Sequence, residues 1–375
     1  MKIIVNAATN NIGGGLQVAI SFISECIKFT RHTYYVFINN EIEKQLNLNS
    51  YTENFHFYKI PKLKFYQYNS YLSDIEKSIK ADIVFSIFGP TYWRPKVPHI
   101  MGFAMGHYIY PDSPYWNMIS LKDKFIWFLK KKIHLFYFKR DADEFICETK
   151  DAAVRLQKII NKKCHVVSNT CSDFFYKFQI KKETDFTFLS QKDNNEYRFL
   201  AVCTPYLHKN LHIIPKVLDE LKKNDTIKPV FILTINKDEF TKIIPKKYRN
   251  NVVPIGRIDI SKLPYLYSEC DFVFIPSLLE CFTANFPEAM IMKKPILAAN
   301  LDYAKSICDN AAVYFDPLSS KDISAKIIEL IKNKKRQTQL IENGLKKLSS
   351  FNNASERANL YINILETKIK CHDYI

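Results

Sequence analysis

Short runs of apolar, β-branched and aromatic residues alternate along this chain with longer stretches of helical periodicity. Strand and helix in alternation are typical of a parallel sheet with helices on both faces, because parallel strands need long crossover connections. In the first half we predict strands at 3–6, 34–38, 55–60, 83–87, 99–104, 144–147 and 165–167. The pattern then begins again, with predicted strands at 197–202, 230–235, 252–254, 272–275 and 295–298. The sequence therefore predicts an α/β protein with two Rossmann-like, doubly wound domains facing each other across a cleft.

The domain boundaries follow from the breaks in this pattern. Residues 185–196 are polar and lack a sustained period, which indicates a linker. The linker separates a first domain over 1–184 from a second domain over 197–353. The final segment, 354–375, is predicted to form a helix with Leu360, Ile364 and Leu365 on one side.

Composition argues against several classes of protein. No run of about 18 apolar residues is present, so we predict no transmembrane helix. The apolar stretch at the N-terminus is too short for a signal peptide. The nine cysteines are scattered without any Cys-x2-Cys pair, which argues against a disulfide framework and against a zinc site. We therefore expect a cytoplasmic protein with reduced cysteines.

One segment carries much of the net charge of +16. Residues 121–140 contain seven basic residues and one acidic residue, with aromatic side chains interleaved among them. This pattern is typical of an amphipathic helix that lies on an anionic membrane surface. Such a helix would make a cytoplasmic protein peripheral on the membrane. The membrane contacts would be made by Lys124, Trp127, Lys130, Lys131 and Lys132.

Two other interpretations of residues 121–140 stay open. The helix could instead pack on the core by its aromatic face and leave its lysines in water, and we weigh this equally with membrane contact. Binding to nucleic acid is less well supported, because no recognised nucleic-acid motif accompanies the segment. We therefore expect no nucleic-acid partner.

Three consecutive glycines, Gly13, Gly14 and Gly15, lie between the first predicted strand and the following helix. Glycines at such a place let the backbone approach a ligand closely, and a helix N-terminus favours an anion. The run lacks the G-x-G-x-x-G spacing of a dinucleotide site. A tight turn without any ligand is the alternative.

Two carboxylates eight residues apart, Glu280 and Glu288, follow the predicted strand 272–275. A helix is predicted to begin at Pro287, since proline suits a first helical turn. Carboxylates at the carboxyl end of a strand can accept hydrogen bonds from sugar hydroxyls. The nearby helix N-terminus would favour a diphosphate.

The Glu-x7-Glu spacing and its context resemble the signature of the family 4 retaining glycosyltransferases, which have the GT-B fold. The resemblance covers residues 197–320 and, more loosely, the first domain. It implies that Glu288 binds the ribose hydroxyls of a nucleotide sugar and that Glu280 holds the donor sugar near its reacting carbon. It also implies that Gly14 and Gly15 lie under the donor phosphates, and that the C-terminal helix crosses back to the first domain.

Lys209 follows the first strand of the second domain and matches the phosphate-binding lysine of that family. Its charge would stabilise the departing diphosphate. The family usually carries an arginine where this chain has Thr204. Arg257 could supply the missing charge, and Gly256 beside it is expected to lie close to the nucleotide base.

The chain departs from the family pattern around Glu280. Glycines of the family are replaced by Cys281 and Thr283, and its proline falls at the position of Asn285. We expect Cys281, Phe282 and Thr283 to line the donor pocket and to affect which sugar it accepts.

Aromatic residues follow two strands of the first domain, and we expect them to bind the acceptor. Tyr92 and Trp93 follow strand 83–87, and Tyr108 follows strand 99–104. Their rings would stack on a sugar face. His107 lies where the family often has a histidine near the donor sugar or the reacting centre. The alternative is an ordinary surface histidine, which a histidine in a loop usually is.

The resemblance implies transfer of a hexose from a nucleoside diphosphate sugar with retention of configuration, without a bound metal or other cofactor. The basic aromatic segment adds a lipid-linked saccharide acceptor at the inner face of the cytoplasmic membrane. Assembly of a bacterial surface polysaccharide, such as lipopolysaccharide O-antigen or capsule, is the expected setting.

Two alternatives remain. One is another GT-B enzyme, such as a sugar-nucleotide epimerase or a phosphorylase. The other is a non-catalytic basic protein that binds a membrane or nucleic acid and retains a decayed sugar-nucleotide site. The substitutions at Thr204, Cys281 and Thr283 keep this second alternative open.

Overall fold

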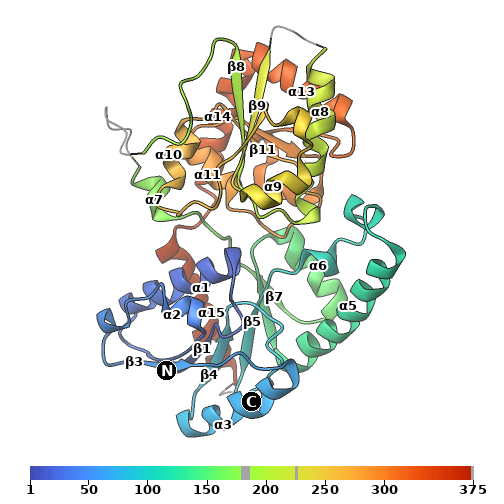
Figure 1. The fold of residues 1–375 in the computed structure, drawn as a ribbon. Helices are drawn as coiled ribbons and strands as arrows, with labels where there is room; N and C mark the ends of the chain where they lie inside the picture. Colours follow the sequence, from blue (N-terminus) through green and yellow to red (C-terminus); the bar gives the residue numbers. More distant parts are fainter. Residues whose placement is uncertain (179–185, 224–226, 373–375) are drawn as a thin grey trace. The chain divides into compact units, whose positions relative to one another are not determined.

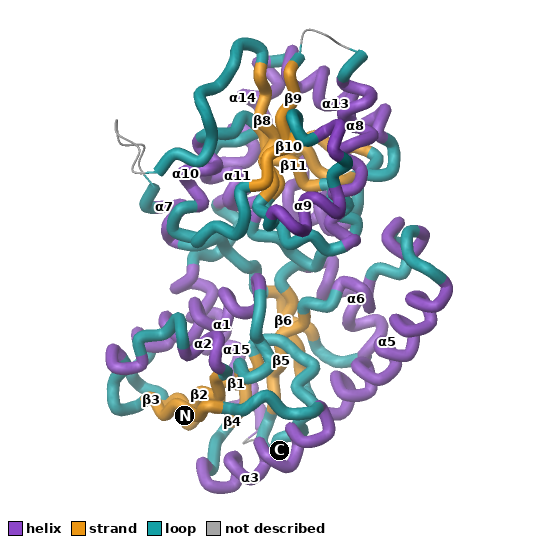
Figure 2. Tube along the Cα trace, in the orientation of Figure 1, coloured by secondary structure: helices purple, strands orange, loops and turns teal. Residues whose placement is uncertain are grey.

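The computed structural model describes the chain except for residues 179–185, 224–226 and 373–375. The chain forms two compact units (Figure 1). The first consists of Met1–Pro111, Ile119–Asn169 and Asn352–Ile375, and the second of Asp112–Met118 and Thr170–Phe351. In each unit the strands run through the interior and helices lie outside them (Figure 2).

Within the described residues, the first unit has a seven-stranded parallel sheet in the order β3-β2-β1-β4-β5-β6-β7. The strands are β1 Lys2–Asn6, β2 Thr33–Ile38, β3 Phe55–Lys59, β4 Ile83–Ser86, β5 His99–Phe103, β6 Glu144–Cys147 and β7 Cys164–Val166. The helices are α1 Gly13–Glu25, α2 Asn40–Glu43, α3 Tyr68–Ile79, α4 Gly106–Ile109, α5 Leu121–Asp141, α6 Lys150–Ile160 and α15 Ala354–His372. Strands β1, β4 and β5 are almost entirely buried, as expected for parallel strands covered on both faces.

The second unit repeats this design with a six-stranded parallel sheet, counted over its described residues, in the order β10-β9-β8-β11-β12-β13. Its strands are β8 Glu196–Ala201, β9 Lys228–Leu233, β10 Val252–Pro254, β11 Phe272–Ile275, β12 Ile296–Ala299 and β13 Ala312–Phe315. Its helices are α7 Asp173–Tyr176, α8 Ile214–Leu221, α9 Lys237–Ile243, α10 Leu263–Ser268, α11 Asn285–Ile291, α12 Asp302–Cys308, α13 Ser320–Lys332 and α14 Lys334–Leu348. The two predicted doubly wound sheets are therefore confirmed, and β13 is a strand that the sequence pattern missed.

The C-terminal helix α15 belongs to the first unit. Its buried face consists of Ala358, Tyr361, Ile362 and Leu365, which recur at the spacing of one helical face. The Tyr361 ring packs against Phe22 of α1 and Phe85 of β4, with ring centroids 5.4 and 5.1 Å apart. The predicted apolar side was wrong at Leu360, which is 37% exposed, because the helix turns Tyr361 toward the core instead.

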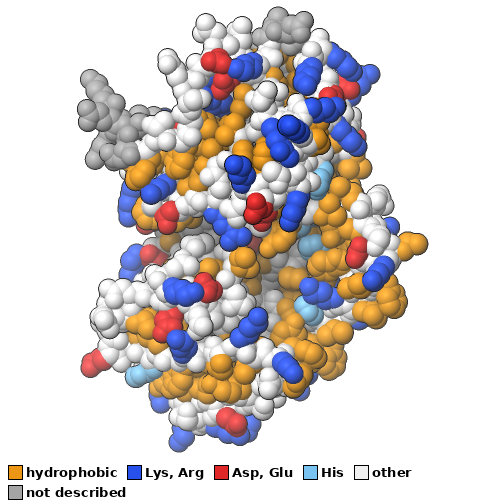
Figure 3. Space-filling model, viewed as in Figure 1, with side chains coloured by type: hydrophobic (Ala, Val, Ile, Leu, Met, Phe, Trp, Pro, Cys, Tyr) orange, Lys and Arg blue, Asp and Glu red, His pale blue; other side chains and the backbone are white. Residues whose placement is uncertain are grey.

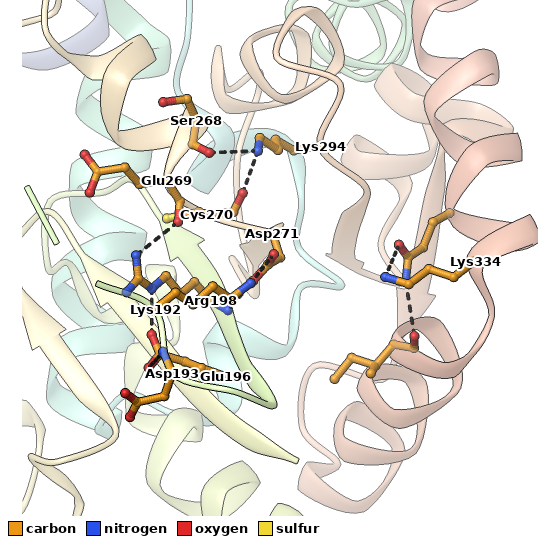
Figure 4. A network of polar contacts seen from close by, with 12 residues as sticks. Lys192, Asp193, Glu196, Arg198, Ser268, Glu269, Cys270, Asp271, Lys294 and Lys334 are labelled. Carbon is orange, nitrogen blue, oxygen red and sulfur yellow. Dashed lines mark hydrogen bonds and ion pairs between the residues drawn. The ribbon is translucent and has the colours of Figure 1, made fainter. Parts of the chain in front are cut away.

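The amino ends of β8 and β11 are joined by a network of charged groups (Figure 4). The Arg198 side chain, 5% exposed, donates to Glu196 at 2.6 Å and to the carbonyl of Ser190 at 2.7 Å. The backbone N–H of Arg198 donates to Asp271, which also pairs with Lys192 at 2.6 Å. Buried charges are tolerated when they are paired in this way. The network fixes β8 beside β11 at the sheet edge opposite their carboxyl ends.

The unit boundary differs from the predicted one. The units divide after Asn169 rather than after residue 184, and Asp112–Met118 belongs to the second unit although its flanking residues belong to the first. The predicted linker, 185–196, begins at a residue outside the described part of the chain. Its described portion, 186–195, contains no helix or strand, and β8 begins at Glu196.

No helix in the described residues is long and apolar enough to cross a membrane. All nine cysteines lie in the described part of the chain, and none of them forms a disulfide there.

Tyr361→Ala should lower the free energy of unfolding of the first unit by about 3–5 kcal/mol, because it removes a buried ring from the contact between α1, β4 and α15. Urea unfolding followed by tryptophan fluorescence measures this, since Trp93 and Trp127 lie in that unit. The neighbouring exposed Leu360→Ala is the control and should change stability by less than about 1 kcal/mol. Equal effects of the two substitutions would contradict the packing of α15.

Candidate functional site

Strand order places the candidate site of the second unit at the carboxyl ends of β8 and β11. Strand β8 lies between β9 and β11, so the chain runs outward from β8 in both directions. In open α/β sheets a ligand binds outside the carboxyl ends of the strands at the point where the strand order reverses. Lys209 follows β8 and Glu280 follows β11, so both residues flank this point.

Lys209 and Glu280 form an ion pair through Nζ and Oε1, although they are 71 residues apart in the chain. Their side chains are only 16% and 11% exposed. Burial by itself lowers the pKa of Lys209, but the negative charge of Glu280 and their hydrogen bond outweigh burial and raise it. The lysine is therefore held as a cation at a partly buried position.

Asn210 sets the direction in which the Lys209 loop leaves the strand end. Its φ of 56° lies in the left-handed region, which asparagine adopts more readily than most residues. Its side-chain amide donates to the carbonyl of Pro317 at 2.9 Å and is buried. Lys209 is therefore anchored by the residue that follows it.

The backbone before Glu280 is held by side chains from distant parts of the sequence. Tyr303 donates its hydroxyl proton to the carbonyl of Ser277 at 2.7 Å, and Ser113 donates to the carbonyl of Leu278 at 2.6 Å. The N–H of Leu278 donates to the carbonyl of His208, next to Lys209. The two loops that carry the ion pair are therefore directly hydrogen-bonded to each other.

Sequence reasoning did not identify these supporting residues. Ser113 and Tyr115 belong to the segment Asp112–Met118 of the second unit, and the Tyr115 ring lies 6.3 Å from that of His208. Burial, together with the Lys209 charge, lowers the pKa of His208 to about 4, so its imidazole is neutral at neutral pH. Only the three-dimensional contacts identify these residues, since no local sequence signal marks them.

Glu288 lies in the first turn of α11 and is only 4% exposed. It accepts a hydrogen bond of 2.8 Å from the hydroxyl of Tyr267 on α10, a partner that the sequence did not predict. Burial raises the pKa of Glu288 to about 7. The helix begins at Asn285, two residues before the predicted start at Pro287. Pro287 is tolerated inside the first turn because the first N–H groups of a helix have no hydrogen-bond partner within it.

The segment between the two glutamates is partly accessible. Cys281 is buried, whereas Phe282 and Thr283 are half-buried. The Phe282 ring packs toward Phe351, with ring centroids 6.2 Å apart. The side chain of Asn285 donates to the carbonyl of Val202 at 2.6 Å and so ties the start of α11 to the end of β8.

Gly256 and Arg257 follow β10, which lies two strands away from β8. Neighbouring strands are about 4.8 Å apart, so the ends of β8 and β10, where the two loops begin, lie roughly 10 Å apart. Gly256 has a φ of +83°, which favours glycine, and Arg257 is exposed.

In the first unit the glycine run forms the start of α1. Gly13 has a φ of +65°, and a Cβ atom added at Gly14 would meet no atom within 4 Å. Across the residues that the structure describes, no side chain caps the N-terminus of α1, and the buried Oδ1 atom of Asn10 has no hydrogen-bond partner. The backbone at this helix start is therefore open to a ligand.

Of the aromatic residues predicted to bind the acceptor, two are core residues. Trp93 is fully buried and donates its Nε1 proton to Ser73, and Tyr108 is also fully buried. Their rings are covered by protein and cannot stack on a sugar in this structure, which contradicts the predicted role. Tyr92 is half-buried, with a φ of +55°.

His107 is stacked against Trp127 of α5, with ring centroids 4.1 Å apart and an interplanar angle of 5°. The ring of Trp127, predicted to contact membrane, is therefore engaged within the protein. The basic residues predicted beside it differ in exposure: Lys130 and Lys132 are exposed, and Lys124 and Lys131 are half-buried.

Comparison with known proteins agrees with this architecture. Residues 182–347 match the family model described as glycosyl transferases group 1. None of the curated proteins matches the chain by sequence. The GT-B glycosyltransferase fold, with its two Rossmann-like domains, is shown by the likeness to solved structures.

Three of these structures cover nearly the whole chain. Sucrose-phosphate synthase from Thermosynechococcus elongatus has a TM-score of 0.72 at 11% identity, covering 99% of this chain and 100% of that one. Anabaena HepE in complex with UDP and glucose has a TM-score of 0.69 at 13% identity, covering 98% and 99%. WaaG, a glycosyltransferase involved in lipopolysaccharide biosynthesis, has a TM-score of 0.69 at 14% identity, covering 96% and 98%.

The raised pKa of Glu288 predicts a pH effect on stability. Its pKa is about 7 in the folded protein against an ordinary value of 4.5, so folding favours the protonated acid. The stability from this group is fully present below about pH 4.5 and is lost as the pH rises through about 7. Glu288→Gln should therefore become more stable relative to the unchanged protein between about pH 5 and about pH 8.

Urea unfolding at several pH values measures this difference. Glu342→Gln, at an exposed position on α14, is the matched control and should show the same pH dependence as the unchanged protein. Parallel curves for Glu288→Gln and the unchanged protein would mean that Glu288 is ionised in the folded state across this range.

Proposed function

We propose that this protein is a retaining glycosyltransferase that moves a hexose from a nucleoside diphosphate sugar to a saccharide acceptor. The observation that carries the proposal is the Lys209–Glu280 pair at the point where the strand order reverses, with Glu288 in the first turn of the adjacent helix α11. This arrangement lies within the residues that match the group 1 model. Members of family 4 use residues of these types at this spacing for a nucleotide-sugar donor.

In the proposed reaction Lys209 binds the donor diphosphate. A cation that is already fixed at the site stabilises the negative charge that develops on the leaving phosphate. The raised pKa of Lys209 keeps it charged at neutral pH. In the free protein Glu280 neutralises this charge, so the diphosphate competes with Glu280 for Lys209.

The two glutamates have separate proposed roles. Glu280, once released from Lys209, accepts a hydrogen bond from a hydroxyl of the donor sugar. Glu288 accepts hydrogen bonds from the ribose hydroxyls in place of its present contact with Tyr267. The leaving phosphate accepts the proton of the acceptor hydroxyl on the same face of the sugar, so no protein nucleophile is required.

Other residues of the second unit complete the donor site. Gly256 approaches the nucleotide base, and Phe282 and Thr283 line the sugar pocket. The buried side chain of Cys281 reduces the size of this pocket. The position of β10 two strands away from β8 favours a contact of Arg257 with the nucleoside over one with the diphosphate. That the reaction needs no cofactor or metal stays a prediction.

The first unit is proposed to bind the acceptor. Gly14 and Gly15 at the start of α1 provide backbone N–H groups for the donor phosphates, and Tyr92 and His107 remain candidates for sugar contacts. The exposed basic and aromatic side chains of α5 support an anionic membrane as partner and a lipid-linked saccharide as acceptor. We place the reaction in the assembly of a bacterial surface polysaccharide, with the protein peripheral on the inner face of the cytoplasmic membrane.

Thermal shift against UDP, GDP, ADP and CMP tests donor binding. A ligand bound only by the folded state adds about 2.7 kcal/mol at a hundredfold excess over its dissociation constant. We expect one nucleotide to raise the melting temperature, and Glu288→Gln to abolish that shift, while Glu342→Gln should retain it. Flat curves with all four nucleotides would instead favour a decayed site in a non-catalytic binding protein.

The ion pair predicts opposite effects of its two members on the affinity for the selected nucleoside diphosphate. Lys209→Met should weaken binding at least tenfold, because the diphosphate loses its cation. Glu280→Gln should strengthen binding several-fold, because the diphosphate no longer competes with a carboxylate. Isothermal titration measures both, with the exposed Lys216→Met as control. Weaker binding in Glu280→Gln would contradict the proposed competition.

A further inference from the structure

The helix α5 presents apolar side chains to solvent where a surface helix ordinarily presents polar ones. Phe125, Leu129, Ile133 and Phe136 are 61%, 44%, 52% and 58% exposed. Their spacing of four, four and three residues places them on one side of the helix. Leu121 and Phe128 extend this side and are 82% and 54% exposed.

The opposite side of α5 is firmly held by the first unit. His134 is hydrogen-bonded to the hydroxyls of Tyr108 at 2.8 Å and Tyr92 at 3.0 Å. Phe138 is buried, and Trp127 stacks on His107. The apolar side is therefore turned outward by specific contacts on the other side of the helix.

A second element continues this surface. The 3-10 turn Phe65–Gln67 exposes Phe65 by 51% and Tyr66 by 60%. The Phe65 ring lies 6.4 Å from that of Tyr137 on α5. We call the outward side of α5 together with Phe65 and Tyr66 the apolar face. At the right-hand side of the view, Figure 3 shows hydrophobic side chains mixed with lysine and arginine on this part of the molecule.

The charges around the apolar face are almost all positive. Lys122, Lys130, Lys132 and Lys139 are exposed along α5, and Lys64 is exposed beside Tyr66. Of the two acids of α5, Asp123 accepts a hydrogen bond from Ser120 at 2.7 Å at the helix start, and Asp141 is buried and paired with Arg140. A large exposed apolar patch marks an interaction site, and the cores of protein interfaces are depleted in lysine. Aromatic side chains flanked by lysines instead match the boundary between lipid headgroups and acyl chains.

We propose that the apolar face inserts into the surface of an anionic lipid bilayer, with the flanking lysines on the headgroup phosphates. The inference rests on the proposed function for its biological setting. It adds which residues of the proposed membrane contact enter the lipid. It differs from adsorption by charge alone, because exposed apolar side chains form a continuous row along the outward side of α5, with Lys122 and Lys132 among them. It also replaces Trp127, whose ring is engaged by His107, with Phe125, Leu129, Ile133 and Phe136 as the inserting residues.

Co-flotation with vesicles tests the insertion. The probes are phosphatidylcholine vesicles and vesicles of phosphatidylcholine and phosphatidylglycerol in a ratio of about three to one. We expect the full chain to float with the anionic vesicles, and part of this binding to survive at about 0.5 M salt, because screening weakens charge contacts but not apolar insertion. The double substitution L129E/I133E should lower the bound fraction at least tenfold.

A matched control separates this result from misfolding and from a general effect of added acid. Val154→Glu places a carboxylate at another exposed apolar position of the first unit, 44% exposed on α6, and should leave vesicle binding unchanged. The L129E/I133E protein should keep the far-UV spectrum and the nucleotide-induced thermal shift of the unchanged protein. Loss of flotation by L129E/I133E with a retained nucleotide-induced thermal shift supports insertion of the apolar face. Flotation of the unchanged protein without any nucleotide-induced shift would overturn the proposed function alone.

Three results would overturn the inference. The first is absence of binding to either vesicle. The second is binding that disappears fully at high salt and is unaffected by L129E/I133E, which would mean adsorption by charge. The third is self-association of the unchanged chain, dispersed by L129E/I133E, without vesicle binding, which would assign the apolar face to a second copy of the chain.

Discussion

Parallel strands force the chain to return across each sheet before the next strand can pair. The burial of the strands and the position of the candidate site both depend on that constraint. The returns are made by helices that cover both faces, so strands such as β4, β5 and β11 are buried throughout their length. All carboxyl ends then meet at one edge of each sheet. In the second unit that edge brings Lys209 and Glu280 together across 71 residues of sequence. The charged network around Arg198 fixes the opposite edge.

Much of the fold is readable from local sequence because each buried strand is a short apolar run between turn residues. Of the thirteen strands in the described residues, twelve were predicted, with ends shifted by two residues at most. Strand β13 was missed because its four residues, with Val313 and Tyr314 only half-buried, carry too weak a signal. The membership of Asp112–Met118 in the second unit was not predictable, because it depends on contacts such as Ser113 with Leu278.

The candidate site divides in the same way. The spacing of Glu280 and Glu288 and the position of Lys209 after a strand are sequence signals, and the structure brings Lys209 and Glu280 into contact. Tyr267, Tyr303 and Ser113 support these residues from distant segments and leave no local trace. Trp93 and Tyr108 were expected to bind a sugar because aromatic rings that follow strands can stack on a sugar face, yet both are buried. Sequence alone cannot distinguish an aromatic ring that binds ligand from one that fills a core.

The account depends on Lys209 acting on a leaving diphosphate. The most direct test is slow release of nucleoside diphosphate from a panel of nucleotide sugars, in which water takes the sugar in place of the saccharide acceptor, by the unchanged protein and by Lys209→Met. We predict release from one donor and a loss of about 10²–10³-fold in Lys209→Met, the range found when one preorganised charge-stabilising group is removed. Equal release by both proteins, or no release from any donor, would contradict the central claim.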